Sequence, residues 1–502
     1  DFIFLPRILE LEVEGGREPK KEHQCTCVLL QSEAYWLKSA FGDMRTSAAV
    51  LSPVLNFSRG FAAETESFRK LARRVGRSAR EGADAYRGAI ETQREITRRV
   101  KELGRRMIAR IEEEPKRSAV VLFGRPYNAF AGEANLGIPT KLASRGIMAL
   151  PWDALSLEKE YAHEQMSWAM GQSLWKAAEL VKRHPQLFGV FITNFSCGPD
   201  SFLVPYFREI MGSKPSLTLE LDSHTADAGV NTRIEAFWDI VKRYRELGTP
   251  EEPKEPFIPA RVDITGKGPV FVSSKGDRVS LYDKRVHVLF PSMGRLGSEA
   301  IAAALRGAGV RASALPEYDF DTLKLGRANS SGKECLPLQL TLGGLIRYLE
   351  ERDPREYTAY FMPTTGGNCR FTQYSVFMSR YIERKQVPNV ALLSLTTENG
   401  YAGFPVTEML KALKMIIVSD VMEDIRCALI ALAEDVGEGM KVFERQWREI
   451  LSVVESGRGS GALYGRLEQA ASRLAEIPLR RRLDEAMKVA MVGEIFVRRD
   501  GY

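Results

Sequence analysis

The sequence predicts an α/β protein with two similar lobes, parallel-type sheets flanked by helices, helical insertions and a helical C-terminus. Three observations predict this class. Short apolar runs typical of buried strands alternate with amphipathic helical segments. This alternation occurs twice, and a proline-rich stretch separates the two copies. The chain of 502 residues, with 44% hydrophobic content, is long enough to bury two or three cores.

The first 114 residues combine a strand-like start with a long helical segment. Residues 1–61 open with DFIFLPRIL and are expected to form the N-terminal part of lobe one, which carries Cys25 and Cys27 in the sequence CTC. Because Asp, not Met, opens this strand-like stretch, we expect the natural protein to continue upstream. Residues 62–114 are predicted to be helical, since apolar side chains recur at steps of three and four: Ile96, Val100, Leu103, Met107 and Ile111.

Residues 115–246 are predicted to form the first α/β lobe. The segment SAVVLFGRPYN reads as a strand that ends in a turn at Gly124, followed by a helix, IPTKLASRGI, and a second apolar run, IMAL. A later helix, QSLWKAAELVKRHP, ends at a proline, and the strand LFGVFITN runs into FSCGPDSF. Cys197 therefore lies just beyond the carboxyl end of a predicted strand.

A linker or an edge hairpin is predicted over residues 247–284, which are rich in proline and polar residues. The second lobe is predicted over residues 285–430, where the strand and turn VHVLFPSMGRLG, two helices and the strand YTAYFMPT repeat the plan of lobe one. Residues 431–502 are predicted to be C-terminal helices that cover a lobe or a partner.

The two lobes place a cysteine at corresponding points. Gly294 precedes Cys369 by nearly the same interval as Gly124 precedes Cys197. Sites in open α/β sheets form outside the carboxyl ends of the strands. If the two lobes face one another, we expect these loops to line a shared cleft.

Composition argues against several classes of function. The 71 Lys and Arg against 65 Asp and Glu leave a formal net charge of +6, so we interpret the basic residues as solvated helix faces and expect no nucleic-acid partner. No run of about 18 uncharged apolar residues occurs, and no charged and apolar leader opens the chain. We therefore expect a cytoplasmic protein with no membrane partner.

The six cysteines are too few for a disulfide scaffold in so long a chain. Five of them lie beside Gly, Pro or polar turn residues, whereas Cys427 lies in an apolar helical pattern and is expected to be buried and inert. Zinc would favour CxxC pairs or histidines, and the chain has no CxxC and five scattered histidines. Spacing leaves two interpretations open, namely an iron–sulfur cluster and thiols that are inert or redox-sensitive.

Two of the turn cysteines have surroundings that favour an anionic sulfur. Cys335, in GKECLP, precedes a predicted helix, whose N-terminus would stabilise a thiolate, and Lys333 acts in the same direction. Cys369, in GGNCR, is followed by Arg370 and preceded by two glycines that let backbone amides approach closely.

Five segments in fixed order resemble the cluster-bearing part of the large acyl-CoA dehydratase activase-related proteins, relatives of the 2-hydroxyacyl-CoA dehydratase and benzoyl-CoA reductase components and of the double-cubane cluster proteins. The resemblance covers about residues 1–430. The segments are VVLFGRPYN, TNFSCGPDSF, LELDSHTADAGVNTRIEAF, SSGKECLPLQLT and MPTTGGNCRFTQY.

This resemblance implies two α/β lobes around an iron–sulfur cluster. Its ligands would be Cys27, with Cys25 as the alternate, and three further cysteines: Cys197, Cys335 and Cys369. Four good candidates favour a single 4Fe-4S cluster, and a double cubane, which needs about six thiolates, is the alternative. Lys333 and Arg370 would tune the charge of the cluster.

The resemblance also implies partners. Electrons would come from an ATP-hydrolysing activator with an actin-like fold, or from a fused upstream ATPase domain, because this chain shows no phosphate loop of its own. ATP would therefore bind to a partner or to an upstream domain. The substrate would be an acyl-CoA or another small molecule, and the assembly a homodimer or a hetero-oligomer.

Two other motifs have both a structural and a functional interpretation. Asp222 and His224 are candidates for proton supply, and the alternative is a hydrogen-bonded loop or lobe interface. The turn GRPYN could contact a phosphate, but Pro126 interrupts the amide array, so we favour a structural turn.

The sequence thus predicts an iron–sulfur electron-transfer or reductase component driven by an ATP-dependent activator. The alternative is a non-catalytic scaffold that uses a structural cluster and docks the ATPase to a dehydratase or reductase. A metal-free thiol enzyme is a third interpretation.

Overall fold

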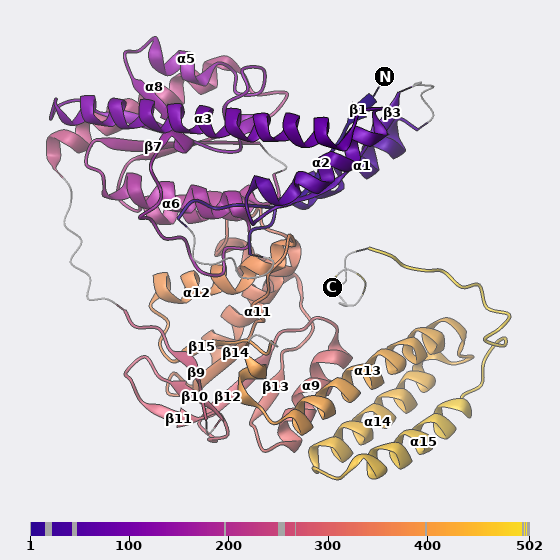
Figure 1. Ribbon diagram of the computed structural model, residues 1–502. Coiled ribbons are helices and arrows are strands. Elements are labelled where there is room, and N and C mark those ends of the chain that lie inside the picture. The colour runs from indigo at the N-terminus through magenta and orange to yellow at the C-terminus, as the bar shows by residue number, and fades with distance from the viewer. Residues whose placement is uncertain are drawn as a thin grey trace. The chain divides into compact units, whose positions relative to one another are not determined.

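The computed structural model describes residues 2–15, 23–42, 48–194, 197–248, 257–266, 268–396, 399–493, 496 and 498 (Figure 1). Contacts divide the chain into two compact units. Unit 1 comprises Asp1–Pro253 and Thr365–Val376, and unit 2 comprises Lys254–Thr364 and Phe377–Tyr502. The predicted α/β class, with parallel sheets flanked by helices and a helical C-terminus, is confirmed.

The central sheet of unit 1 has four parallel strands in the order β6-β5-β7-β8. All five residues of β5 are buried, because a parallel sheet is covered by helices on both faces. Val120, Phe188 and Leu219 belong to the core cluster. The elements of this part are β5 (Ala119–Phe123), α4 (Pro126–Ala129), α5 (Ile138–Ala143), β6 (Met148–Pro151), η2 (Trp152–Ala154), α6 (Ala169–Arg183), β7 (Leu187–Asn194), α7 (Asp200–Met211), β8 (Ser216–Leu221) and α8 (Asp227–Leu247).

The described N-terminal part of unit 1 has two small parallel strand pairs and three α-helices, of which α3 is the longest. Ser78 and Glu81 form a capping box that starts α3, a helix of 34 residues. A Cβ on Gly104 would lie 2.1 Å from the Ala154 carbonyl oxygen, so glycine lets α3 pack closely against η2. The elements are β1 (Phe2–Phe4) paired with β3 (Ala49–Leu51), β2 (Arg7–Leu11) paired with β4 (Val54–Phe57), α1 (Val28–Ala40), η1 (Phe61–Glu64), α2 (Thr65–Arg74) and α3 (Ala79–Glu112).

Unit 2 repeats the sheet plan of unit 1, with four parallel strands in the order β13-β12-β14-β15. In each sheet the first strand in the chain lies between the second and the third. Positions 249–256 of the predicted linker lie outside the described residues. The described residues of the remainder, up to 284, contain a three-stranded antiparallel sheet in the order β11-β10-β9. The strands are β9 (Arg261–Thr265), β10 (Gly268–Val272), β11 (Arg278–Ser280), β12 (Val286–Phe290), β13 (Ala312–Ala314), β14 (Tyr357–Phe361) and β15 (Val390–Leu393).

Helices cover this sheet and form the C-terminal bundle seen in orange and yellow in Figure 1. Phe443, Trp447 and Ile450 of α14 form its buried core together with residues of α9, α13 and α15. No helix in the described ranges is both long and apolar enough to span a bilayer. The helices are α9 (Arg295–Gly307), α10 (Phe320–Ala328), α11 (Leu336–Glu351), η3 (Arg370–Gln373), α12 (Tyr374–Lys385), η4 (Gly400–Gly403), α13 (Val406–Leu432), α14 (Val436–Glu455) and α15 (Ser460–Ala475).

Glycine at position 326 allows α10 to lie directly against α11. A Cβ on Gly326 would stand 1.8 Å from the Gln339 carbonyl oxygen, so Gly326→Ala must push the two helices apart. We expect the free energy of unfolding of unit 2 to fall by about 1–3 kcal/mol in urea denaturation. Gly465→Ala in α15, where a Cβ meets nothing within 4 Å, should be neutral or stabilising. Equal effects of the two variants would contradict this packing.

Candidate functional site

The two cysteine turns occupy equivalent places in the two sheets. In unit 1 the adjacent strands β5 and β7 lead into the turn at Gly124 and into Cys197. In unit 2 the adjacent strands β12 and β14 lead into Gly294 and into the loop of Cys369. Both pairs are topological switch points, where open α/β sheets place their ligand sites.

Three of the predicted ligand cysteines share one local geometry. Cys27, Cys335 and Cys369 are each the extended residue that immediately precedes a helix, respectively α1, α11 and η3. The helix predicted after Cys335 is therefore confirmed. The N-termini of α1 and α11 offer unpaired N–H groups that stabilise a thiolate or an anionic ligand.

The segment Thr365–Val376, which carries Cys369, is grouped with unit 1. The Asn368 side-chain amide donates to Gln31 Oε1 at 2.9 Å, and Gln31 lies in the first turn of α1, just after Cys27. The Trp168 indole donates to the Asn368 carbonyl at 3.4 Å. This segment therefore lies against the helix that Cys27 begins.

The same segment also reaches the Cys197 turn. A Cβ on Gly198 would lie 3.7 Å from Cδ of Arg370. In unit 1, the segment that carries Cys369 therefore adjoins both the helix that follows Cys27 and the turn that carries Cys197. Cys335 belongs to unit 2, and its place among the ligands stays a prediction.

The donor set fits an iron–sulfur cluster in its chemistry. The four thiols precede a helix or follow a strand. In the turn beside the Cys197 turn, Nη2 of Arg125 is a buried guanidinium nitrogen that has no partner among the described residues. Among the described residues, however, no group of three or more His, Cys, Asp and Glu side chains is arranged so that it could hold a metal ion.

Cys197 lies beside a buried ion pair that the sequence did not reveal. Nε of Arg125 is 3.2 Å from Oδ1 of Asp200, and the Thr193 hydroxyl donates to Oδ2 of Asp200 at 2.8 Å. Arg125 is 7% exposed and Asp200 2%. The Tyr127 hydroxyl is 3.9 Å from the Cys197 sulfur. Reading the turns GRPYN and CGPD together, as neighbours at one switch point, could have predicted this pairing.

Burial, followed by the negative charge of Asp200, raises the pKa of the Cys197 thiol to about 12, although Arg125 opposes the shift. In iron-free protein, Cys197 should therefore react slowly with iodoacetamide at neutral pH, because only the thiolate is nucleophilic. We expect its rate to keep rising with pH beyond 9, as peptide mapping by mass spectrometry would show. A rate that levels off near pH 8 would contradict the raised pKa.

Cys25 and Cys27, the two alternative ligands predicted from the CTC sequence, differ in their exposure to solvent. Cys25 is 6% exposed, its N–H donates to the Ser167 carbonyl at 2.9 Å, and its own carbonyl accepts from Ala169. Cys27 is partly exposed at the start of α1. Its placement makes Cys27 the more accessible of the two thiols.

Cys427 is exposed, so the expectation of a buried thiol is wrong. The pattern around Cys427 is helical, as expected, in α13. Its apolar neighbour Leu429 faces the core, whereas Cys427 faces outward with its sulfur 3.9 Å from a carboxylate oxygen of Glu423. Because α13 is rich in apolar residues, its sequence did not show which face of the helix packs against the core.

Asp222 and His224 lie in the exposed turn between β8 and α8. Asp222 Oδ1 accepts from the Thr225 hydroxyl at 2.8 Å and from the His224 N–H at 2.9 Å. These hydrogen bonds lower the pKa of Asp222. The arrangement is that of a hydrogen-bonded loop, the structural interpretation of this motif.

The two predicted cationic residues differ in their surroundings. Lys333 is exposed in the loop before Cys335, and its N–H donates to a carboxylate oxygen of Glu334 at 3.1 Å. Arg370 is half-buried between Cys369 and the Cys197 turn.

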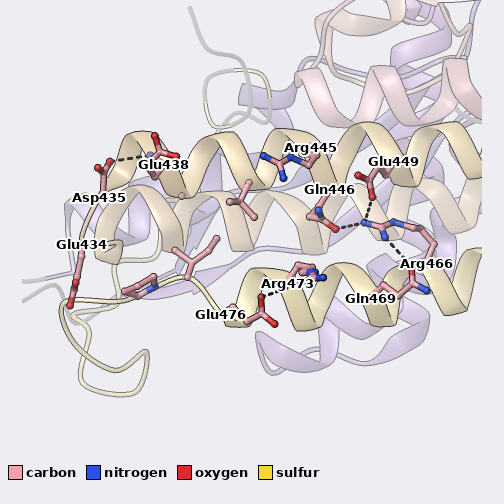
Figure 2. Close-up of a pocket in the computed structure, with 14 residues that line it drawn as sticks. Glu434, Asp435, Glu438, Arg445, Gln446, Glu449, Arg466, Gln469, Arg473 and Glu476 are labelled. Atoms are coloured by element: carbon pink, nitrogen blue, oxygen red, sulfur yellow. Dashed lines mark hydrogen bonds and ion pairs between the residues drawn. The ribbon is translucent and has the colours of Figure 1, made fainter.

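A cavity of about 900 Å³ lies between α14 and α15, and none of the predicted site residues lines it (Figure 2). Figure 2 shows the carboxylates of Glu434, Asp435 and Glu438 near its left end, and Arg466 bonded to neighbouring side chains on the right. The Arg466 guanidinium lies 2.7 Å from Glu449 and 3.0 Å from Gln469. Because its charges are largely paired, we assign no chemistry to this cavity.

Comparison with known proteins gives one match. Residues 1–155 match the family described as "CoA enzyme activase uncharacterised domain". No curated protein and no solved structure matches the chain. The matched part includes Cys25, Cys27 and the turn of Arg125, and it supports a relation to the activases of CoA enzymes.

Proposed function

We propose that this protein is an iron–sulfur electron-transfer or reductase component that acts with an ATP-hydrolysing activator on an acyl-CoA or another small substrate. The observation that carries the proposal is that the segment bearing Cys369 adjoins, in unit 1, both the helix that follows Cys27 and the turn that bears Cys197. The match of residues 1–155 to an activase domain supports the link to CoA enzymes.

Each thiol has a stated role in this proposal. Cys27, Cys197 and Cys369 would hold the cluster, and the resemblance adds Cys335 as the fourth ligand. When bound, the cluster supplies one-electron transfer. Arg370 places a positive charge beside two of the thiols, which offsets the negative charge that thiolate ligands bring. The Asn368 to Gln31 hydrogen bond holds two ligand-bearing segments together.

Anaerobic purification with counting of iron and acid-labile sulfide tests the proposal. We expect about four irons per chain and an absorption band that dithionite bleaches. About eight irons would favour a double cubane. A band that dithionite leaves unchanged would favour the scaffold alternative. If anaerobic reconstitution leaves no iron, the proposal is wrong and the cysteines serve thiol chemistry or packing.

A further inference from the structure

The turn Gly124–Tyr127 contains the strongest unexplained feature of unit 1. Arg125 is 7% exposed, and its Nη2 is buried with no hydrogen-bond partner in the described part of the chain. A buried guanidinium N–H without an acceptor is costly, and such groups in native structures call for a bound partner or a special role. In the described part of the chain, Asp200 pairs with this guanidinium through Nε.

Two further groups beside Arg125 suit an anion. Tyr127 is 61% exposed, and its hydroxyl lies 3.9 Å from the Cys197 sulfur. Solvent therefore reaches the turn on the side of Tyr127. Arg370 lies over Gly198 of the Cys197 turn, with its Nε 3.9 Å from the position of a Cβ on that glycine, and its guanidinium adds a positive charge there. Since Arg125 and Asp200 neutralise each other, the positive charge of Arg370 is in excess here.

The repeat in unit 2 provides an internal comparison. Arg295 follows Gly294 at the corresponding turn after β12. Its guanidinium is paired with carboxylates, since Nη2 lies 2.5 Å from Glu444 Oε1 and Nη1 lies 3.4 Å from Glu299 Oε2. The corresponding turns therefore carry, in unit 2, an arginine whose two terminal nitrogens face carboxylates and, in unit 1, an arginine with one terminal nitrogen that has no partner among the described residues.

We infer that Arg125, Tyr127 and Arg370 form a subsite for an anionic oxygen, a carboxylate or phosphate oxygen of a small substrate, next to Cys197. Arg125 Nη2 donates to this oxygen, the Tyr127 hydroxyl turns from the Cys197 sulfur to donate to it as well, and Arg370 supplies the balancing charge. This inference deepens the proposed function by giving the substrate class, and it makes GRPYN a binding turn instead of the structural turn that the sequence favoured.

Trp152 reports on this subsite, because its indole N–H donates to the Gly124 carbonyl at 3.0 Å. Protein labelled with 5-fluorotryptophan is titrated with acetate, inorganic phosphate and CoA, and fluorine NMR follows the resonance assigned by Trp152→Phe. A saturable shift with acetate alone identifies a carboxylate, and one with phosphate and CoA identifies a phosphate. If none of the three probes shifts the resonance, the inference is overturned.

Variants test which residues bind the anion. Arg125→Gln should weaken binding by at least about tenfold, since a hydrogen bond to a charged group is lost, and Tyr127→Phe by about threefold or more. Arg295→Gln, the matched control, should bind as the parent protein does. If Arg125→Gln fails to fold, Tyr127→Phe and Arg370→Gln decide the matter, since these residues are not buried. Unchanged binding in both would overturn the inference.

Iron counts on the same samples separate this inference from the proposed function. Anion binding in a protein that takes up no iron would refute the cluster and keep the subsite. Iron uptake without any anion binding would refute the subsite and keep the cluster.

Discussion

Serine at position 369 is expected to remove most of the iron and the visible absorbance of the anaerobically purified protein. A hydroxyl is a poor ligand for cluster iron. Cys369 lies on the segment that contacts both α1 and the Cys197 turn. Cys27→Ser and Cys197→Ser should have the same effect. Iron and sulfide analysis with an absorption spectrum measures it, and circular dichroism confirms that each variant is folded.

Two substitutions serve as controls for this series. Cys427→Ser should keep the full iron content, because Cys427 lies exposed on α13 and not in a turn after a strand. Cys25→Ser should also keep it if Cys27 is the ligand, although loss of the buried thiol could lower stability. Full iron content in Cys369→Ser would refute the ligand assignment.

Cys335→Ser tests the part of the assignment that rests on sequence alone. Loss of iron in this variant would support Cys335 as the fourth ligand of the cluster. Full iron content would mean that the cluster is held within unit 1.

The fold class could be predicted from the sequence because the strands that start the two sheets are short and mostly apolar. The segments AVVLF and VHVLF become β5 and β12, the buried strands that start the two parallel sheets. Strands covered on both faces lose the alternation of polar and apolar residues, so their apolar runs stand out between helices. The glycine turns that follow mark where these strands end.

The candidate site could be predicted from the sequence only in part. Local patterns placed Cys335 before a helix and Cys369 in a glycine-rich turn after a strand, because the Pro at the start of α11 and the Gly pair before Cys369 are short-range signals. The partner of Arg125 is Asp200, 75 positions away, and no periodicity connects the two. The attachment of Asn368 to Gln31 likewise depends on tertiary structure, at a separation of 337 residues.

Replacing Asp200 by alanine is expected to lower the free energy of unfolding of unit 1 by about 3–5 kcal/mol. The substitution leaves the Arg125 cation, 7% exposed, without its counter-charge, and the penalty of an unpaired buried charge exceeds the value of the pair itself. It also removes the acceptor of the Thr193 hydroxyl. Urea denaturation followed by tryptophan fluorescence measures the loss.

The matched control is Asp239→Ala, whose ion pair with Lys242 is exposed, and it should change stability by less than about 0.5 kcal/mol. Combining Asp200→Leu with Arg125→Met should recover much of the loss, because two apolar side chains leave no buried charge. The double variant should nevertheless bind no anion at the turn. A loss below about 1 kcal/mol for Asp200→Ala would mean that solvent reaches Arg125, and the buried pair would then contribute little to holding the Cys197 turn.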